Sequence, residues 1–164
     1  RSHNKLRATT RQPAIDVAGR AWMDMVDIAN RATPRETGGI LLGYRTGTQV
    51  RVVGAAEVAD AAATESSYTL LHHAAQARLD EVRHYFPSGS PVGFVGDWHV
   101  HPRNLPPSPV DRRSITRLGR HYRRRVATIV VVCEDFEWVP HGLVASRRRS
   151  WPCAVRVEED RTER

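Results

Sequence analysis

The sequence has few cysteines, almost no lysine and no long apolar run. Its 164 residues include two cysteines, and Lys5 is the only lysine. Two cysteines are too few for a disulfide framework, which excludes the small disulfide-stapled secreted domains. No apolar run approaches the roughly 20 residues that a membrane-spanning helix needs, so a membrane span is not expected.

Cysteine usage and the first residues bear on the compartment. Cys133 ends the apolar run of residues 126–132, so we expect a buried free thiol, with a disulfide to Cys153 as the alternative. The first 12 residues are polar and do not resemble a cleavable signal peptide. We therefore expect a reducing, cytoplasmic setting.

The formal net charge of +7 comes almost entirely from arginine. Arginines cluster at residues 123–125 and 147–149, where they could contact phosphates. A solvated face and a patch for an acidic protein are the alternatives. Since no aromatic stripe or known nucleic-acid module accompanies the arginines, nucleic acid is not the expected partner.

The length and patterning indicate one globular domain. We expect residues 1–11 to form a flexible tail and residues 12–164 to form the domain. Apolar spacing of three or four predicts helices over residues 13–31, with Pro13 near the start, and 71–86. Ser108, Pro109 and Asp111 fit the start of a third helix that runs to about residue 124.

Strand signals alternate with these helices. Apolar and β-branched runs predict strands over residues 40–44, 50–58, 92–101, 126–133, 137–145 and 153–158. The pattern predicts an α/β (α+β) fold in which helices flank a mixed central β-sheet.

The strand over residues 92–101 ends in the most informative motif, Gly-Asp-Trp-His-Val-His-Pro. Side chains alternate along a strand, so His99 and His101 project from the same face, while Trp98 faces the core. Two imidazoles with a nearby carboxylate are the ligands of a hydrolytic zinc site that keeps one position open. Asp111 follows closely, and Glu36 lies far upstream.

Each of these residues also has a purely structural interpretation. Ser108 and Asp111 form a helix capping box, the two histidines fit a polar strand edge, and Glu36 fits a surface carboxylate. Five other histidines lack a partner at ligand spacing, so we expect them to be solvated or locally bonded: His72, His73, His84, His121 and His141.

Taken together, the motif residues resemble the JAMM (MPN+, JAB) metalloprotease family, and its prokaryotic JAB branch in particular. The signature of that family is a glutamate, then His-x-His, then Ser-x-x-Asp. Here it corresponds to Glu36, to His99 and His101, and to Ser108 and Asp111. The resemblance extends over residues 13–145 and implies a single MPN/JAB-like domain. One difference is the connection between His101 and Ser108, which has six residues where the family usually has seven.

The resemblance implies a zinc-dependent isopeptidase or peptidase. His99, His101 and Asp111 would hold Zn²⁺, and a water at the fourth position would be the nucleophile. Glu36 would act as general base and acid, and Ser108 would donate to the oxyanion.

The implied substrate is a bond after the C-terminal tail of a ubiquitin-like modifier or in its conjugates, and E1- and E2-like enzymes encoded in the same operon are implied as partners. Bacterial ubiquitin-like and anti-phage operons contain such peptidases. Two alternatives stay open, a catalytically silent MPN scaffold in a complex and a basic nucleic-acid-associated JAB-like protein.

Overall fold

The computed structural model describes residues 12–159, which form seven strands and three helices. The strands are β1 (Ala14–Val17), β2 (Gly38–Thr46), β3 (Gln49–Glu57), β4 (Gly93–His101), β5 (Val126–Glu134), β6 (Glu137–Ala145) and β7 (Ser150–Val157). The helices are α1 (Gly19–Ala32), α2 (His72–Arg83) and α3 (Pro109–Tyr122). The predicted tail, residues 1–11, lies outside the described residues.

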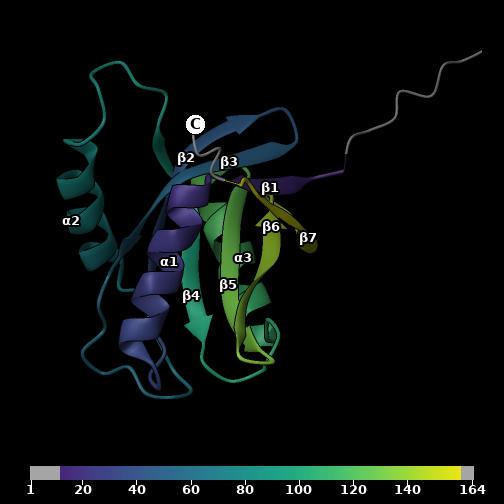
Figure 1. The fold of residues 1–164 in the computed structure, drawn as a ribbon. Helices are drawn as coiled ribbons and strands as arrows, with labels where there is room; N and C mark the ends of the chain where they lie inside the picture. Colours follow the sequence, from purple (N-terminus) through teal and green to yellow (C-terminus); the bar gives the residue numbers. More distant parts are fainter. Residues whose placement is uncertain (1–11, 160–164) are drawn as a thin grey trace, which may run out of the picture.

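The strands form one mixed sheet that closes into a barrel in the order β1-β3-β2-β4-β5-β6-β7 (Figure 1). β4 pairs antiparallel with β2 and parallel with β5. β1 pairs parallel with both β3 and β7 and thereby closes the sheet. The predicted α/β fold with a mixed central sheet is confirmed, and its closure is an additional finding.

The helix predicted over residues 13–31 is wrong at its start. Residues Ala14–Val17 form β1, and α1 begins only at Gly19. Ile15 fits the helical spacing of the residues after it, but it is fully buried in the barrel and pairs with Val50. Strand pairing with distant parts of the chain therefore outweighs the local pattern at this position.

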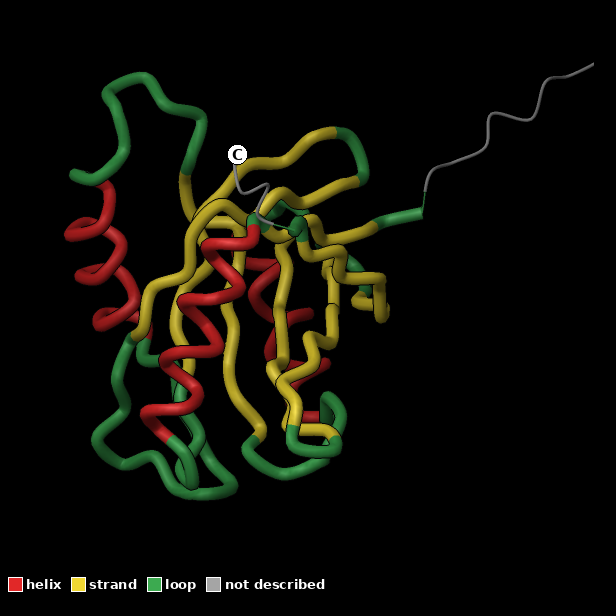
Figure 2. The backbone as a smooth tube through the Cα atoms, viewed as in Figure 1, coloured by secondary structure: helices red, strands yellow, loops and turns green. Residues whose placement is uncertain are grey.

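Helices cover both faces of the sheet (Figure 2). Met25 of α1 packs with the fully buried Trp98 of β4 in the largest core cluster, which confirms that Trp98 faces the core. On the opposite face, Leu79 of α2 packs over β2 and β3, while Ile115 of α3 packs over β5 and β6. β4 lies between α2 and α3, so its outward side chains face the space between two helices.

The cysteines of the described part of the chain are both free thiols, as predicted for Cys133. Cys133 is half-buried rather than buried, because it lies near the end of β5, beyond the apolar run. Within residues 12–159, no helix is both long enough and apolar enough to cross a membrane.

Candidate metal centre

A bulge in β4 directs the metal-binding side chains outward. Leu41 pairs with Gly96 and Leu42 with Phe94, so the register shifts there by one residue. A Cβ on Gly96 would lie 1.7 Å from the carbonyl oxygen of Ala127, and its φ is +154°, so this position requires glycine.

Beyond the bulge, strand alternation separates two sets of side chains. Asp97, His99 and His101 line a cavity between α2 and α3, while Trp98 and Val100 are buried in the core. The alternation predicted for the histidine pair is therefore present in the structure.

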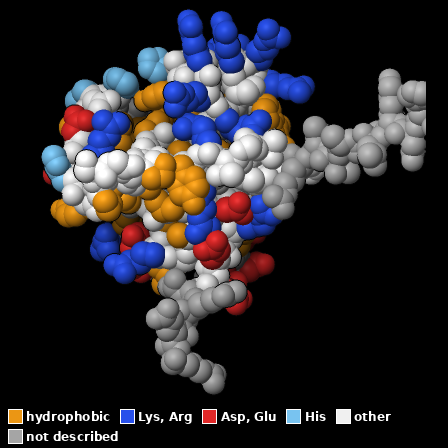
Figure 3. All heavy atoms as spheres, turned by 90° about the horizontal axis from the view of Figure 1, so that it is seen from above, with side chains coloured by type: hydrophobic (Ala, Val, Ile, Leu, Met, Phe, Trp, Pro, Cys, Tyr) orange, Lys and Arg blue, Asp and Glu red, His pale blue; other side chains and the backbone are white. Residues whose placement is uncertain are grey.

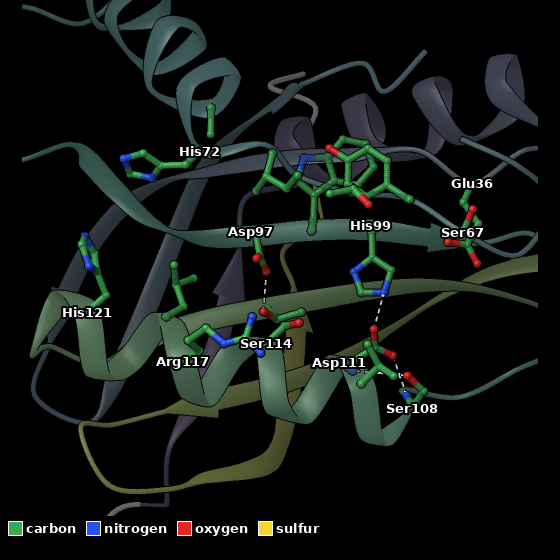
Figure 4. A pocket seen from close by; sticks show the side chains of 18 of the residues that line it. Glu36, Ser67, His72, Asp97, His99, Ser108, Asp111, Ser114, Arg117 and His121 are labelled. Carbon is green, nitrogen blue, oxygen red and sulfur yellow. Dashed lines mark hydrogen bonds and ion pairs between the residues drawn. The ribbon is translucent and has the colours of Figure 1, made fainter. Parts of the chain in front are cut away.

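His99, His101 and Asp111 converge on one point, and Figure 4 shows the contact between His99 and Asp111. The two histidine Nε2 atoms are 3.2 Å apart, and Oδ1 of Asp111 lies 3.1 Å from Nε2 of His99. Oδ2 of Asp111 lies 3.8 Å from Nε2 of His101. Two ligands about 2.0–2.1 Å from a tetrahedral ion lie roughly 3.3 Å apart, so the three groups fit one metal ion.

The second ring nitrogen of His101 is held by the loop that follows β4. Nδ1 of His101 lies 2.7 Å from the carbonyl oxygen of Leu105. A carbonyl oxygen can only accept, so Nδ1 carries the proton and the Nε2 lone pair is free for a metal. This is the usual outer contact that orients a metal-binding histidine.

Asp111 is positioned by the first turn of α3. The Asp111 N–H donates to Oγ of Ser108 (3.2 Å), and the Ser108 N–H donates to Oδ2 of Asp111 (2.5 Å). The predicted capping box and N-terminal Pro109 are confirmed. Oγ of Ser108 acts as an acceptor here, and a serine hydroxyl that accepts one hydrogen bond can also donate one to a ligand in the cavity.

Glu36 lines the same cavity but does not belong to the three-ligand group. Its N–H donates to the carbonyl oxygen of Thr64 (2.7 Å). A Cβ on Gly38 would lie 2.3 Å from the carbonyl oxygen of Trp98 and 2.9 Å from Cα of His99. Glycine at position 38 thus lets β2 approach β4 beside the histidines and places Glu36 near the metal centre.

The ligand pKa values respond to one another and to burial. Burial lowers the pKa of His99, but the hydrogen bond and charge of Asp111, with the charges of Asp97 and Glu36, outweigh it and raise that pKa. Burial raises the pKa of Asp111, but His99 and Ser108 hold it far below its usual range. Without a metal, these shifts favour an ion pair between His99 and Asp111, whose Nε2 and Oδ1 atoms are 3.1 Å apart.

The pKa values of His101 and Glu36 shift mainly because these side chains are partly buried. Burial lowers the pKa of His101, and the charge of His99 adds to this effect. Burial also raises the pKa of Glu36, with an opposing contribution from His99 and a further rise from Asp111. A glutamate with a raised pKa accepts and returns a proton more readily near neutral pH.

The cavity is a groove of about 880 Å³ that extends from the metal centre along α3. Its floor includes Asp97, whose Oδ1 accepts a hydrogen bond from the hydroxyl of Thr128. Asp97 was not predicted as a site residue, although alternation from His99 places it on the same face. The contact of Asp97 with Thr128 and the walls of the groove form between segments that are far apart in the sequence.

The five other histidines of residues 12–159 are solvated or locally bonded, as predicted. His72, His73, His84 and His121 are exposed. The ring of His141 contacts the carboxylate of Glu134 at 2.5 Å. The rings of His72 on α2 and His121 on α3 lie edge to face, with their centroids 6.1 Å apart, at the end of the groove away from the metal centre (Figure 4).

The His-His-Asp group is suited to hold a metal ion, and comparisons with known proteins identify the family of the chain. Residues 20–153 match the family described as prokaryotic homologs of the JAB domain, so the chain belongs to that family. It is 31% identical over 144 residues to the probable metalloprotease y4qB of Sinorhizobium fredii (strain NBRC 101917 / NGR234), covering 82% of this chain and 85% of that protein. The protein is thus a metalloprotease-like hydrolase of the JAMM (MPN+) type.

A solved structure supports the fold alone. The solution structure of protein DSY2949 from Desulfitobacterium hafniense superposes with a TM-score of 0.68 at 17% identity. The match covers 89% of this chain and 94% of that chain. This match supports the α/β fold, while the JAB assignment rests on the family model over residues 20–153.

Proposed function

We propose that the protein is a zinc-dependent isopeptidase or peptidase that cleaves the amide bond after the C-terminal tail of a ubiquitin-like protein. The observation that carries this proposal is a three-ligand group at one end of a groove, with Glu36 and Ser108 lining the same cavity. Similarity to a probable metalloprotease supports hydrolysis of a peptide-type bond.

Zinc is the metal that this ligand set suits best. Two imidazoles and one carboxylate leave one tetrahedral position open, as in catalytic zinc sites. A bound zinc ion would acidify a water molecule and polarise the substrate carbonyl.

The protein supplies the proton transfers and the oxyanion contact. Glu36 accepts a proton from the attacking water and passes it to the leaving amine, which its raised pKa favours. The hydroxyl of Ser108 donates a hydrogen bond to the developing oxyanion, a contact worth about 3 kcal/mol in other hydrolases.

The groove has room for an extended peptide. From Asp111 to Tyr122, α3 advances about 17 Å at roughly 1.5 Å per residue, which equals about five residues of extended peptide. The opposite wall comes from residues 66–70 and from α2. Small side chains in the tail would allow close approach of its backbone between these walls.

The same interpretation places the protein among enzymes that attach and remove a modifier. E1- and E2-like enzymes encoded nearby would supply the conjugates that it cleaves. We place this activity in the cytoplasm, because Cys133 and Cys153 are free thiols.

The test is cleavage of a five-residue small-side-chain tail linked through an amide to a fluorogenic amine. We expect cleavage that a chelator abolishes and that zinc restores. Zinc binding without cleavage of this peptide or of a ubiquitin-like fusion would instead indicate a silent scaffold. DNA binding that is salt-dependent and survives zinc removal would favour the nucleic-acid alternative.

A further inference from the structure

Six exposed arginines gather at the end of the barrel opposite the metal centre. The arginine-rich surface consists of Arg120, Arg123, Arg124, Arg147, Arg148 and Arg149. Val126 pairs with Ala145, so the C-terminus of α3 and the β6–β7 turn lie side by side. His101 pairs with Val132 at the other end of β5. Figure 3 shows Lys and Arg side chains concentrated along one edge of the face seen from above.

The positive charge of this surface is not compensated within the described residues. Arg51 and Arg156 each pair with a carboxylate, at 2.5 Å and 2.7 Å, whereas none of the six has a carboxylate oxygen within 4.0 Å. The α3 dipole favours cations such as Arg120 at the C-terminus of that helix. The dipole does not explain the arginines of the β6–β7 turn, because that turn lies outside α3.

The groove leads from the metal centre to the arginine-rich surface. Its lining passes from Asp111 through Ser114 and Arg117 to His121 and Tyr122. Arg120 precedes these last two residues and Arg123 follows them. A chain that fills the groove from the metal centre thus leaves it beside the arginines.

We propose that the folded body of the tail-bearing protein docks on the arginine-rich surface through an acidic face around the base of its tail. This inference rests on the proposed function, because a tail that ends at the metal centre places its own domain at the far end of the groove. Arginine guanidinium groups pair well with carboxylates, and complementary charge accelerates and orients such encounters. A nucleic acid has no amide-linked tail with which to fill the groove.

Binding to a pair of matched probes tests the docking. Both probes are one small ubiquitin-fold domain with the same five-residue glycine- and alanine-rich tail, carrying either glutamates or glutamines around the base of the tail. Fluorescence anisotropy with the zinc-loaded protein measures their affinities at about 50 mM and about 300 mM NaCl. We expect the acidic probe to bind about tenfold more tightly at low salt and to lose that advantage at high salt.

Two double variants with the same change in net charge test whether the preference for the acidic probe depends on the arginine-rich surface. Arg147→Glu with Arg148→Glu should remove the advantage of the acidic probe. Arg31→Glu with Arg83→Glu, which changes exposed residues outside the arginine-rich surface, should preserve it. Equal affinity for the two probes, or equal loss in both variants, would overturn the docking. Tighter binding of a short DNA duplex, lost only in the first variant, would overturn it in favour of nucleic acid.

Cleavage of the free tail amide separates this proposal from the proposed function. Charge-dependent binding without any cleavage contradicts the enzyme and leaves the docking supported. Cleavage with no charge dependence contradicts the docking and leaves the enzyme supported.

Discussion

At the N-terminus of α3, the hydroxyl of Ser108 caps the helix and also lines the cavity. Oγ of Ser108 accepts the Asp111 amide hydrogen, and the proposed mechanism also uses this hydroxyl as the donor to the oxyanion. Ser108→Ala should cost about 1 kcal/mol of stability, whereas Ser108→Gly should cost only a few tenths, since glycine is a tolerated N-cap. Both should lower kcat by about 10²–10³-fold, because both remove the oxyanion donor.

Denaturant unfolding and steady-state kinetics on both variants check this prediction. A Ser108→Gly protein with nearly normal kcat would show that the hydroxyl acts only as a cap. Ser108→Thr is the matched control, because threonine retains both the acceptor and the proton.

The ion pair between His99 and Asp111 makes metal affinity depend on pH. Burial lowers the pKa of His99, but the hydrogen bond and charge of Asp111 outweigh it. The pKa of His99 in the folded protein therefore lies above its usual value. A metal ion must displace the proton of His99, so apparent zinc affinity should rise with pH through and above about 6.5, by about tenfold per unit, and then level off.

Competition with a coloured chelator from about pH 6 to about pH 8.5 measures this dependence. Asp97→Asn removes one carboxylate that raises the pKa of His99, so it should move the rise to lower pH. Zinc affinity that is constant over this range would contradict the ion pair.

Among the elements, β2 depends on close backbone contact with β4. A Cβ at Gly38 would meet backbone atoms at 2.3 Å and 2.9 Å, so Gly38→Ala must push the strands apart. We expect a loss of about 2–3 kcal/mol in unfolding free energy, together with reduced activity, because Glu36 moves with β2. Gly93→Ala in β4 is the control, since a Cβ there meets nothing within 4 Å. Equal melting temperatures for the two variants would contradict the close-contact argument.

Elements with a strong local signal could be predicted, and those that depend on distant pairing could not. The N-cap, proline and acidic residue of α3 are adjacent in the sequence, so its start was predicted correctly. β1 is only four residues long and is a strand because it pairs with β3 and β7. Its apolar residues continue the spacing of α1, which made the two elements look like one helix.

At the scale of the whole molecule, the sequence motif identifies the candidate metal ligands but not the residues that surround them. His99, His101 and Asp111 share a short stretch with fixed spacing, whereas the role of Glu36 is implied only by the family resemblance. The contact of Asp97 with Thr128 and the walls of the groove arise only when β5, α2 and α3 meet. The six-residue connection before Ser108 is accommodated, because the capping box forms and Asp111 reaches both histidines.

The central claim is that His99, His101 and Asp111 hold a catalytic metal while Glu36 moves the proton. Its most direct test is the zinc content of the purified protein, of Glu36→Gln and of Asp111→Asn, measured together with cleavage of the tail amide. We predict about one zinc per chain in the wild type and in Glu36→Gln, much weaker retention in Asp111→Asn, and a loss of about 10²–10⁴-fold in activity for Glu36→Gln. A wild-type protein without zinc affinity, or a fully active Glu36→Gln variant, would contradict the claim.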